Sequence, residues 1–145
     1  MAIKPSKRLQ TVLRLAKLKE QRAAESLANS IREVAAHEQQ QQQLEQYKVE
    51  YGDQFYRSLE GALTAGQLAN FQRFYNELEF AGETQQERRV LAEEQQELAR
   101  QQWQQQYARQ KNMEALIERK EQLEQREEDN KLQREQDDRP FKRPE

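Results

Sequence analysis

The segment 61–64 is the one place where a chain built almost entirely of helix-forming residues is expected to turn. Gly61 can end a helix because glycine accepts the left-handed backbone conformation at the C′ position. Thr64 followed by Gln67 has the spacing of a capping box, so a second helix is expected to begin there. Nothing later breaks the helical pattern until Pro140. A connector about four residues long forces two helices to lie antiparallel.

The composition supports long exposed helices and not a compact core. The 145 residues are 34% charged and 34% hydrophobic, with a mean hydropathy of −1.30 and only 4 Gly and 3 Pro. We therefore predict an all-α fold, a long two-helix antiparallel coiled-coil hairpin whose second helix is longer than the first. The predicted single domain covers 1–145, with helix 1 at about 6–60, a turn at about 61–64, helix 2 at about 65–137 and a disordered tail at 138–145.

Apolar residues at three- and four-residue steps place a stripe on one face of each helix. If the chain folds on its turn, residue i should face about residue 124 − i, because both helices rise equally per residue. The facing pairs predicted in this way are Val34 with Val90 and Leu91, Leu27 with Leu98, Val12 and Leu13 with Met113, and Leu9 with Leu116. Residues from about 120 to 137 should then project past the start of helix 1 as a single helix.

Several kinds of chemistry find no support in the sequence. The chain has no cysteine for a disulfide, a thiolate metal site or a nucleophile, and its one histidine, His37, cannot make a zinc site alone. We expect His37 to be solvated. No phosphate-binding loop or catalytic motif is found, so we expect no enzyme and no cofactor. No apolar run approaches the roughly 20 residues of a membrane span, and a cytoplasmic protein is expected.

Most of the aromatic residues gather beside the turn: Tyr47, Tyr51, Phe55, Tyr56, Phe71, Phe74, Tyr75 and Phe80. A two-helix hairpin has one narrow seam and cannot hide all of these rings. An exposed aromatic patch on a polar protein usually marks a partner-binding surface. The alternative is that the whole cluster is a locally wide hairpin core.

The first helix begins with a strongly basic segment. Its cations are Lys4, Lys7, Arg8, Arg14, Lys17, Lys19 and Arg22, and Glu20 is the one acidic residue among them. This segment is either a solvated helix face or a docking surface for an acidic partner.

At this point the sequence resembles a family, the flagellar export protein FliJ, a coiled-coil component of the type III export apparatus. The resemblance covers nearly the whole chain. It is carried by the patterns Leu9-x2-Val12-x2-Leu15-Ala16, Ala23-x3-Leu27, Gln40-x3-Leu44-x2-Tyr47-x3-Tyr51 and Asn70-Phe71-Gln72-x-Phe74-x3-Leu78-x2-Ala81.

The resemblance implies a non-enzymatic stalk at the cytoplasmic face of the flagellar basal body, a monomer when free. Its paired terminal ends would stabilise the export ATPase hexamer, with candidate residues Lys7, Arg8, Leu9, Leu13, Arg14 and Lys17. Residues near the turn would bind the cytoplasmic linker of the membrane export gate protein, with candidates Gln40, Leu44, Tyr47, Tyr51, Phe74, Leu78 and Ala81. The family is also linked to the handling of export chaperones.

Three alternatives remain open from the sequence. The first is the equivalent stalk of a virulence type III secretion system. The second is a self-associating coiled-coil scaffold that binds no ATPase. The third is a nucleic-acid-binding arm formed by the basic segment, against which the sequence pI of about 5.7 argues.

Overall fold

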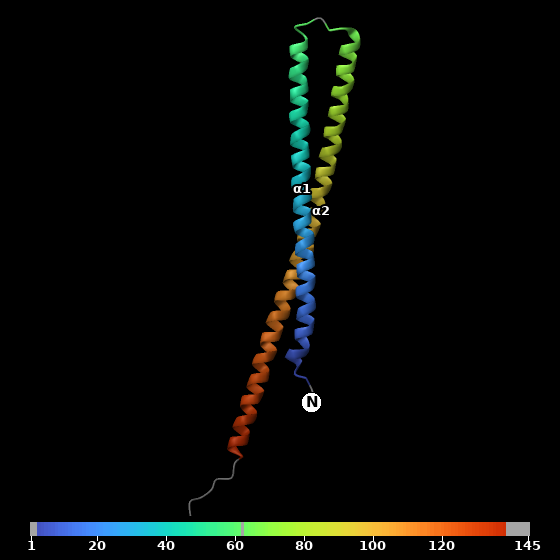
Figure 1. Cartoon of the computed structure of the whole chain (residues 1–145). Helices are drawn as coiled ribbons and strands as arrows, with labels where there is room; N and C mark the ends of the chain where they lie inside the picture. The colour runs from blue at the N-terminus through green and yellow to red at the C-terminus, as the bar shows by residue number, and fades with distance from the viewer. Residues whose placement is uncertain (1–2, 62, 139–145) are drawn as a thin grey trace, which may run out of the picture. The chain divides into compact units, whose positions relative to one another are not determined.

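Two helices make up the protein, as seen in a computed structural model that describes residues 3–61 and 63–138. Helix α1 spans Pro5–Ser58 and helix α2 spans Ala65–Asp137, and the two run antiparallel and pack against each other (Figure 1). No strand is found within the ranges described. The predicted fold class, a two-helix hairpin whose second helix is longer, is confirmed.

The paired helices divide into two compact units. The turn unit comprises Ala24–Gln102, and the terminal unit combines Met1–Ala23 with Trp103–Glu145. Each unit contains a segment of α1 and a segment of α2. The prediction of a single domain over the whole chain stays a prediction, and the predicted disordered tail lies, from residue 139 onward, outside the described residues.

The helix ends at the turn are formed by local hydrogen bonds. The backbone amides of Glu60 and Gly61 donate to the carbonyls of Arg57 and Ser58, which tightens the end of α1 into i→i+3 bonding. Among the residues described, no glycine has a positive φ, so the left-handed cap expected at Gly61 is wrong. The capping box is present: Gln67 N–H donates to Thr64 Oγ1 over 3.2 Å and Thr64 N–H donates to Gln67 Oε1 over 3.0 Å.

The buried and half-buried residues recur mainly every seven positions. In α1 they are Ser6, Leu13, Glu20, Leu27, Val34, Gln41, Lys48 and Phe55, together with Leu9, Ala16, Ala23, Ser30, His37, Leu44 and Tyr51. In α2 they are Phe71, Leu78, Gln85, Ala92, Ala99, Gln106 and Met113, together with Tyr75, Gly82, Arg89, Gln96, Trp103, Gln110, Ile117 and Glu124. A seven-residue period sustained in both helices is the signature of a coiled coil.

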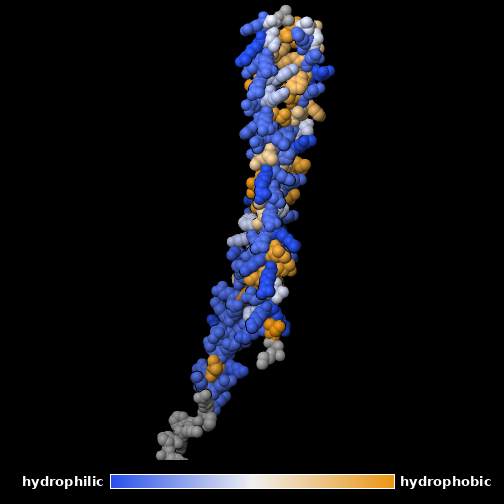
Figure 2. All heavy atoms as spheres, viewed as in Figure 1, coloured by the Kyte–Doolittle hydropathy of each residue, from blue (hydrophilic) through white to orange (hydrophobic). Residues whose placement is uncertain are grey.

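Few side chains of this seam are buried rather than half-buried. The buried apolar residues are Leu13, Val34, Ala92, Ala99 and Ile117, and Ser6 and Gln85 are buried polar residues beside them. The face of the molecule seen in Figure 2 is largely hydrophilic, with separate hydrophobic groups on it.

The predicted facing of Val90, Leu91 and Leu98 toward α1 is wrong. These side chains are 42%, 55% and 59% exposed, respectively. The seven-residue series that contains Ala92 and Ala99 occupies the seam, and a residue one position earlier is rotated about 100° around the helix. The 124 − i rule pairs positions along the two helix axes. It does not predict the direction in which each side chain points around its helix axis.

Cross-helix bonds confirm the predicted level at Glu20 and His37 but not at the start of α1. The residue numbers of the hydrogen-bonded pairs His37–Gln85 and Glu20–Trp103 add up to 122 and 123, close to the predicted 124. At the start of α1, Ser6 bonds Glu124 and Lys4 bonds Glu128. The unpaired extension of α2 therefore begins after Glu128, later than the predicted position near residue 120.

The Ser6–Glu124 contact caps the start of α1. Ser6 Oγ donates to Glu124 Oε2 over 2.7 Å, and the Ser6 backbone N–H donates to Glu124 Oε1 over 3.1 Å. The second bond satisfies an amide that has no partner within α1, and it places a carboxylate at the positive end of the helix dipole. These two hydrogen bonds from Ser6, with the positive charges of Lys4 and Lys120, lower the pKa of Glu124.

The lowered pKa makes this contact sensitive to acid. A depressed carboxylate contributes stability above its unfolded pKa, near 4.3, and loses it as the pH falls through the folded value. Glu124→Gln should therefore lower the Tm at pH 7, and the difference from the unsubstituted chain should vanish by about pH 2. Glu121→Gln, at an exposed position of the same helix segment, is the matched control and should leave the Tm at pH 7 unchanged. A Tm difference for Glu124→Gln that persists in acid would contradict this account.

Candidate protein-binding site

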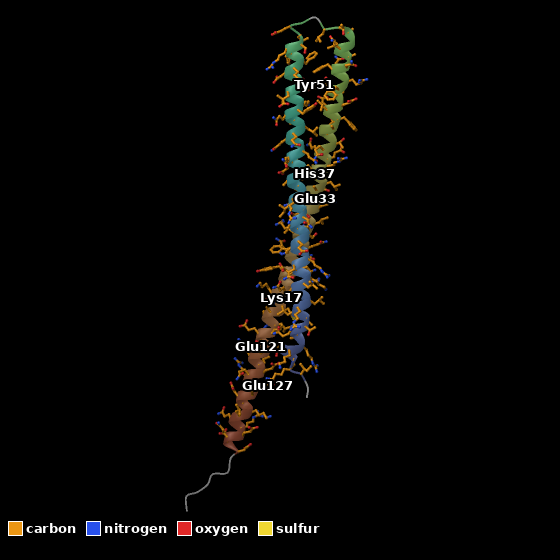
Figure 3. The ribbon with its side chains drawn as sticks, in the orientation of Figure 1. Lys17, Glu33, His37, Tyr51, Glu121 and Glu127 are labelled. Atoms are coloured by element: carbon orange, nitrogen blue, oxygen red, sulfur yellow. The ribbon has the colours of Figure 1, made fainter. Side chains whose placement is uncertain are left out.

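A ladder of aromatic rings joins α1 and α2 in the turn unit. The Phe55 and Phe71 rings stack with centroids 3.7 Å apart, and Tyr51 stacks on Phe71 at 4.9 Å with its plane tilted by only 4°. Tyr51 also meets Phe74 at 4.6 Å. The Tyr51 side chain lies between the two helices (Figure 3). Such ring pairs contribute about 0.5–1.5 kcal/mol each beyond the area they bury.

The ladder continues to the surface on one side. Tyr47 is 52% exposed and meets the half-buried Phe74 ring edge-on at 6.3 Å. Gln40 is exposed on the same helix and Ala81 is half-buried on the other. We call the surface formed by Gln40, Tyr47, Phe74 and Ala81 the tyrosine flank.

The seven residues predicted to bind the export gate are thus divided between seam and surface. Leu44, Tyr51 and Leu78 belong to the seven-residue seam series, and Leu44 and Leu78 line the same polar groove between the helices. Tyr51 contacts Phe74 directly. The rings pack between the helices and none of them is fully buried, so packing and partner binding are compatible roles for the same side chains.

The apolar stripe Phe74, Leu78, Ala81 ends at a buried polar contact. Gln85 is 6% exposed, and its Nε2 lies 2.9 Å from His37 Nδ1 and 3.2 Å from the His37 carbonyl oxygen. An amide nitrogen can only donate, so Gln85 Nε2 is the donor toward the His37 carbonyl oxygen. The expectation of a solvated His37 is wrong, because this residue is half-buried and hydrogen-bonded across the seam.

The opposite side of the aromatic ladder carries a charged cluster. Lys48 Nζ lies 3.6 Å from Glu79 Oε1 and 5.2 Å from the centre of the Tyr75 ring. Partial burial acts to lower the pKa of Lys48, but the electrostatic effects of Tyr75, Glu79 and Glu45, with the hydrogen bond to Glu79, outweigh it and raise the pKa. Lys48 therefore stays protonated and is held over the seam.

The basic segment lies in the terminal unit, and its cations face solvent. Lys7, Arg8, Arg14 and Lys17 are exposed, whereas Leu9 is half-buried and Leu13 is 8% exposed. Of the six residues predicted to bind the ATPase ring, the four cations are therefore accessible and the two leucines pack in the seam.

An apolar groove beside these cations was not predicted from the sequence. It has a volume of about 370 Å³ and is lined by Val12, Leu15 and Ala16 of α1 and by Met113 and Leu116 of α2, with Lys19, Gln106, Arg109 and Asn112 also lining it. Val12 and Leu15 are 45% and 51% exposed. The signal for this groove was present in the Leu9-x2-Val12-x2-Leu15-Ala16 pattern, in which only Val12 was expected to face α2, at Met113.

The described part of the chain lacks candidate metal-binding groups and candidate membrane spans. In residues 3–61 and 63–138 no group of three or more His, Cys, Asp or Glu side chains could hold a metal ion. Within the same ranges, neither helix contains a segment apolar enough to cross a membrane.

The fold and the site define a coiled-coil hairpin protein with an aromatic surface beside its turn and a basic surface on its terminal unit. Comparison with known families matches residues 5–141 to the family described as Flagellar FliJ protein, so the chain belongs to that family and is a component of the flagellar export apparatus. Searches among curated proteins and among solved structures gave no match.

The His37–Gln85 contact can be tested for its role in the seam. Gln85→Ala should lower the free energy of unfolding by about 1–2 kcal/mol, because it leaves the acceptors of His37 without a donor. His37→Leu combined with Gln85→Leu should instead be neutral or raise it by about 1–2 kcal/mol, because apolar residues replace a buried polar pair. Urea unfolding followed by circular dichroism measures both changes.

Disulfide cross-linking tests whether the His37–Gln85 contact also fixes the register of α1 against α2. The chain has no cysteine, so the pair Ser30→Cys with Ala92→Cys should cross-link on oxidation in the observed register. The pair Ser30→Cys with Ala99→Cys should cross-link only after a slip of seven residues. We expect the slipped cross-link in the double leucine variant alone, since a buried polar pair specifies register. Equal yields with and without His37 and Gln85 would show that this pair does not fix the register.

Proposed function

We propose that this protein is the stalk of the flagellar export apparatus, which promotes assembly and activity of the export ATPase ring and links the ring to the membrane export gate. The observation that carries the proposal is the terminal unit, where exposed cations lie beside an apolar groove. Exposed cations attract and orient an acidic partner surface. The apolar groove beside them supplies hydrophobic contact area. The family membership supports the same role.

The tyrosine flank supports the second half of the proposal. Tyr47 and Phe74 present a half-exposed aromatic pair that is held in place by Tyr51. Tyrosine and phenylalanine anchors on a rigid scaffold are typical of the centre of protein–protein interfaces. We propose that this flank binds the cytoplasmic linker of the export gate protein, through the seven residues inferred from the sequence.

Three further parts of the sequence interpretation belong to the proposal. The protein would act at the cytoplasmic face of the flagellar basal body and take part in handling export chaperones. It would be a monomer when free, in contrast to a self-associating scaffold, and sedimentation of the isolated chain separates the two. The family is flagellar, which favours this stalk over its counterpart in a virulence secretion system.

Charge reversal tests the ATPase contact. Arg14→Glu with Lys17→Glu should weaken the half-maximal activation of the export ATPase by about tenfold or more, because two attractive contacts become repulsive. ATP hydrolysis and ring assembly are followed as the protein is titrated into the ATPase. Arg32→Glu with Arg57→Glu is the matched control, with the same charge change at exposed positions of α1 outside the basic segment, and should activate normally. Equal activation by both variants would remove this interface from the proposal.

Truncation of Phe74 on the tyrosine flank and of the neighbouring seam residue Leu78 tests the gate contact. Phe74→Ala with Leu78→Ala should lose most of the binding to the gate linker, since truncated interface anchors cost about 2 kcal/mol or more, a factor of roughly 30 in Kd. Leu68→Ala with Phe80→Ala removes comparable side chains that are 41% and 71% exposed on the same helix, and it should bind normally. Binding is measured by calorimetry and helical content by circular dichroism. A parallel loss of helix would assign the cluster to the hairpin core.

A further inference from the structure

A second groove lies in the turn unit, away from the tyrosine flank. It has a volume of about 660 Å³, and its floor is formed by Phe55, Phe71 and Tyr75. One wall is a stripe of α1 at three- and four-residue steps, Val49, Gly52, Tyr56 and Leu59. Val49, Tyr56 and Leu59 are 56%, 73% and 52% exposed. This is a continuous apolar surface that the family resemblance did not assign.

The groove and the tyrosine flank are on different sides of the hairpin. None of Gln40, Tyr47, Phe74 and Ala81 lines the groove. Tyr47 and Val49 are two residues apart on one helix and therefore point about 200° away from each other. A partner on one side leaves the other side accessible.

The charge around the groove is strongly acidic. Glu45 and Asp53 line it, and an adjoining polar groove that shares Glu45 and Lys48 adds Glu79 and Glu83. The single cation of the two linings, Lys48, already contacts Glu79 and the Tyr75 ring. Within the described residues, Glu45, Asp53 and Glu83 form no salt bridge. The rim therefore presents carboxylates that a cationic partner could neutralise.

Gly52 forms a notch in the apolar wall. A Cβ atom placed on Gly52 would meet no other atom within 4 Å, so the space above this glycine is open. The lining from Glu45 to Leu59 is about 21 Å long at 1.5 Å per residue, which matches about four turns of helix. A long groove between two antiparallel helices has the shape that best accommodates a third helix.

We propose that this acidic groove binds an amphipathic helix of another protein, with aliphatic side chains along its centre and lysine or arginine on both edges. An aliphatic side chain would enter the Gly52 notch and lie against Tyr56 and Tyr75. The basic edges would pair with Glu45 and Asp53. Nucleic acids and anionic membranes carry the wrong charge for this surface. The inference does not depend on the proposed ATPase or gate contacts.

The test uses a synthetic probe. An 18-residue helical peptide, with leucine at three- and four-residue steps and flanking lysines, is labelled with fluorescein and titrated with the full-length protein. Fluorescence anisotropy should show saturable binding that weakens with salt. The same peptide with glutamate in place of lysine should bind at least tenfold more weakly.

Two variants localise the binding. Gly52→Gln fills the notch without loss of thermal stability, since glutamine has the higher helix propensity, and should raise the Kd at least fivefold. Glu45→Gln with Asp53→Asn should raise it by about fivefold and reduce the salt dependence. The controls are Glu33→Gln, an exposed carboxylate of α1 about 18 Å along the helix from Glu45, and Tyr47→Ala on the tyrosine flank, and both should bind the peptide normally.

Three results would overturn the proposal. The first is equal affinity for the lysine and glutamate peptides. The second is unchanged binding by Gly52→Gln and by the double carboxylate variant. The third is a concentration-dependent dimer in sedimentation that Gly52→Gln abolishes, which would assign the groove to a second copy of this chain. Loss of peptide binding in Tyr47→Ala alone would place the peptide on the tyrosine flank, and this result also contradicts the proposal.

Discussion

Two helices share only one seam, and this geometric limit governs the rest of the molecule. A side chain in such a seam is covered by one neighbouring helix and remains open along both edges. Accordingly, few residues fall below one-tenth exposure, and two of the apolar ones are alanines, Ala92 and Ala99. Hydrophobic burial scales with the area removed from water, so this seam supplies less stabilisation per residue than the core of a globular domain. Specific cross-helix contacts therefore contribute a larger share of the stability of this hairpin.

Polar pairs at seam positions supply much of that specificity. Ser6 bonds Glu124, the Trp103 indole N–H donates to Glu20 over 3.0 Å, and Gln85 bonds His37. Each pair joins residues at seam positions of the seven-residue pattern. A slip by one heptad would separate all of these partners and leave polar atoms partly buried without a hydrogen bond. Such pairs add modest stability to the observed register, but they strongly penalise the alternatives.

The hairpin architecture could be predicted from the sequence. The side chains that face the partner helix could not all be predicted, because this depends on the rotation of each helix about its own axis. The capping box at Thr64 and Gln67 and the pairing level could be predicted because they depend on spacing along the chain. The exposure of Leu91 and Leu98 could not, since the alanines in the seam are weaker hydrophobic signals than the leucines beside them. The same ambiguity applied to the site. Tyr47 and Tyr51 differ by four residues and belong to one stripe, yet only Tyr51 stacks in the ring ladder while Tyr47 opens to solvent.

The limit on burial also explains why the described residues form several candidate binding surfaces that are open to solvent. Large side chains beside a narrow seam cannot be withdrawn from water, so Tyr47, Val49, Tyr56 and Phe80 stay about half exposed or more. Aromatic stacking between α1 and α2 holds the neighbouring rings in fixed positions, and rigid rings lose little conformational entropy on binding. Charge then distinguishes one side from another, since carboxylates concentrate beside the Gly52 groove and cations on the terminal unit. A two-helix hairpin can in this way present separate surfaces to chemically different partners without building a larger core.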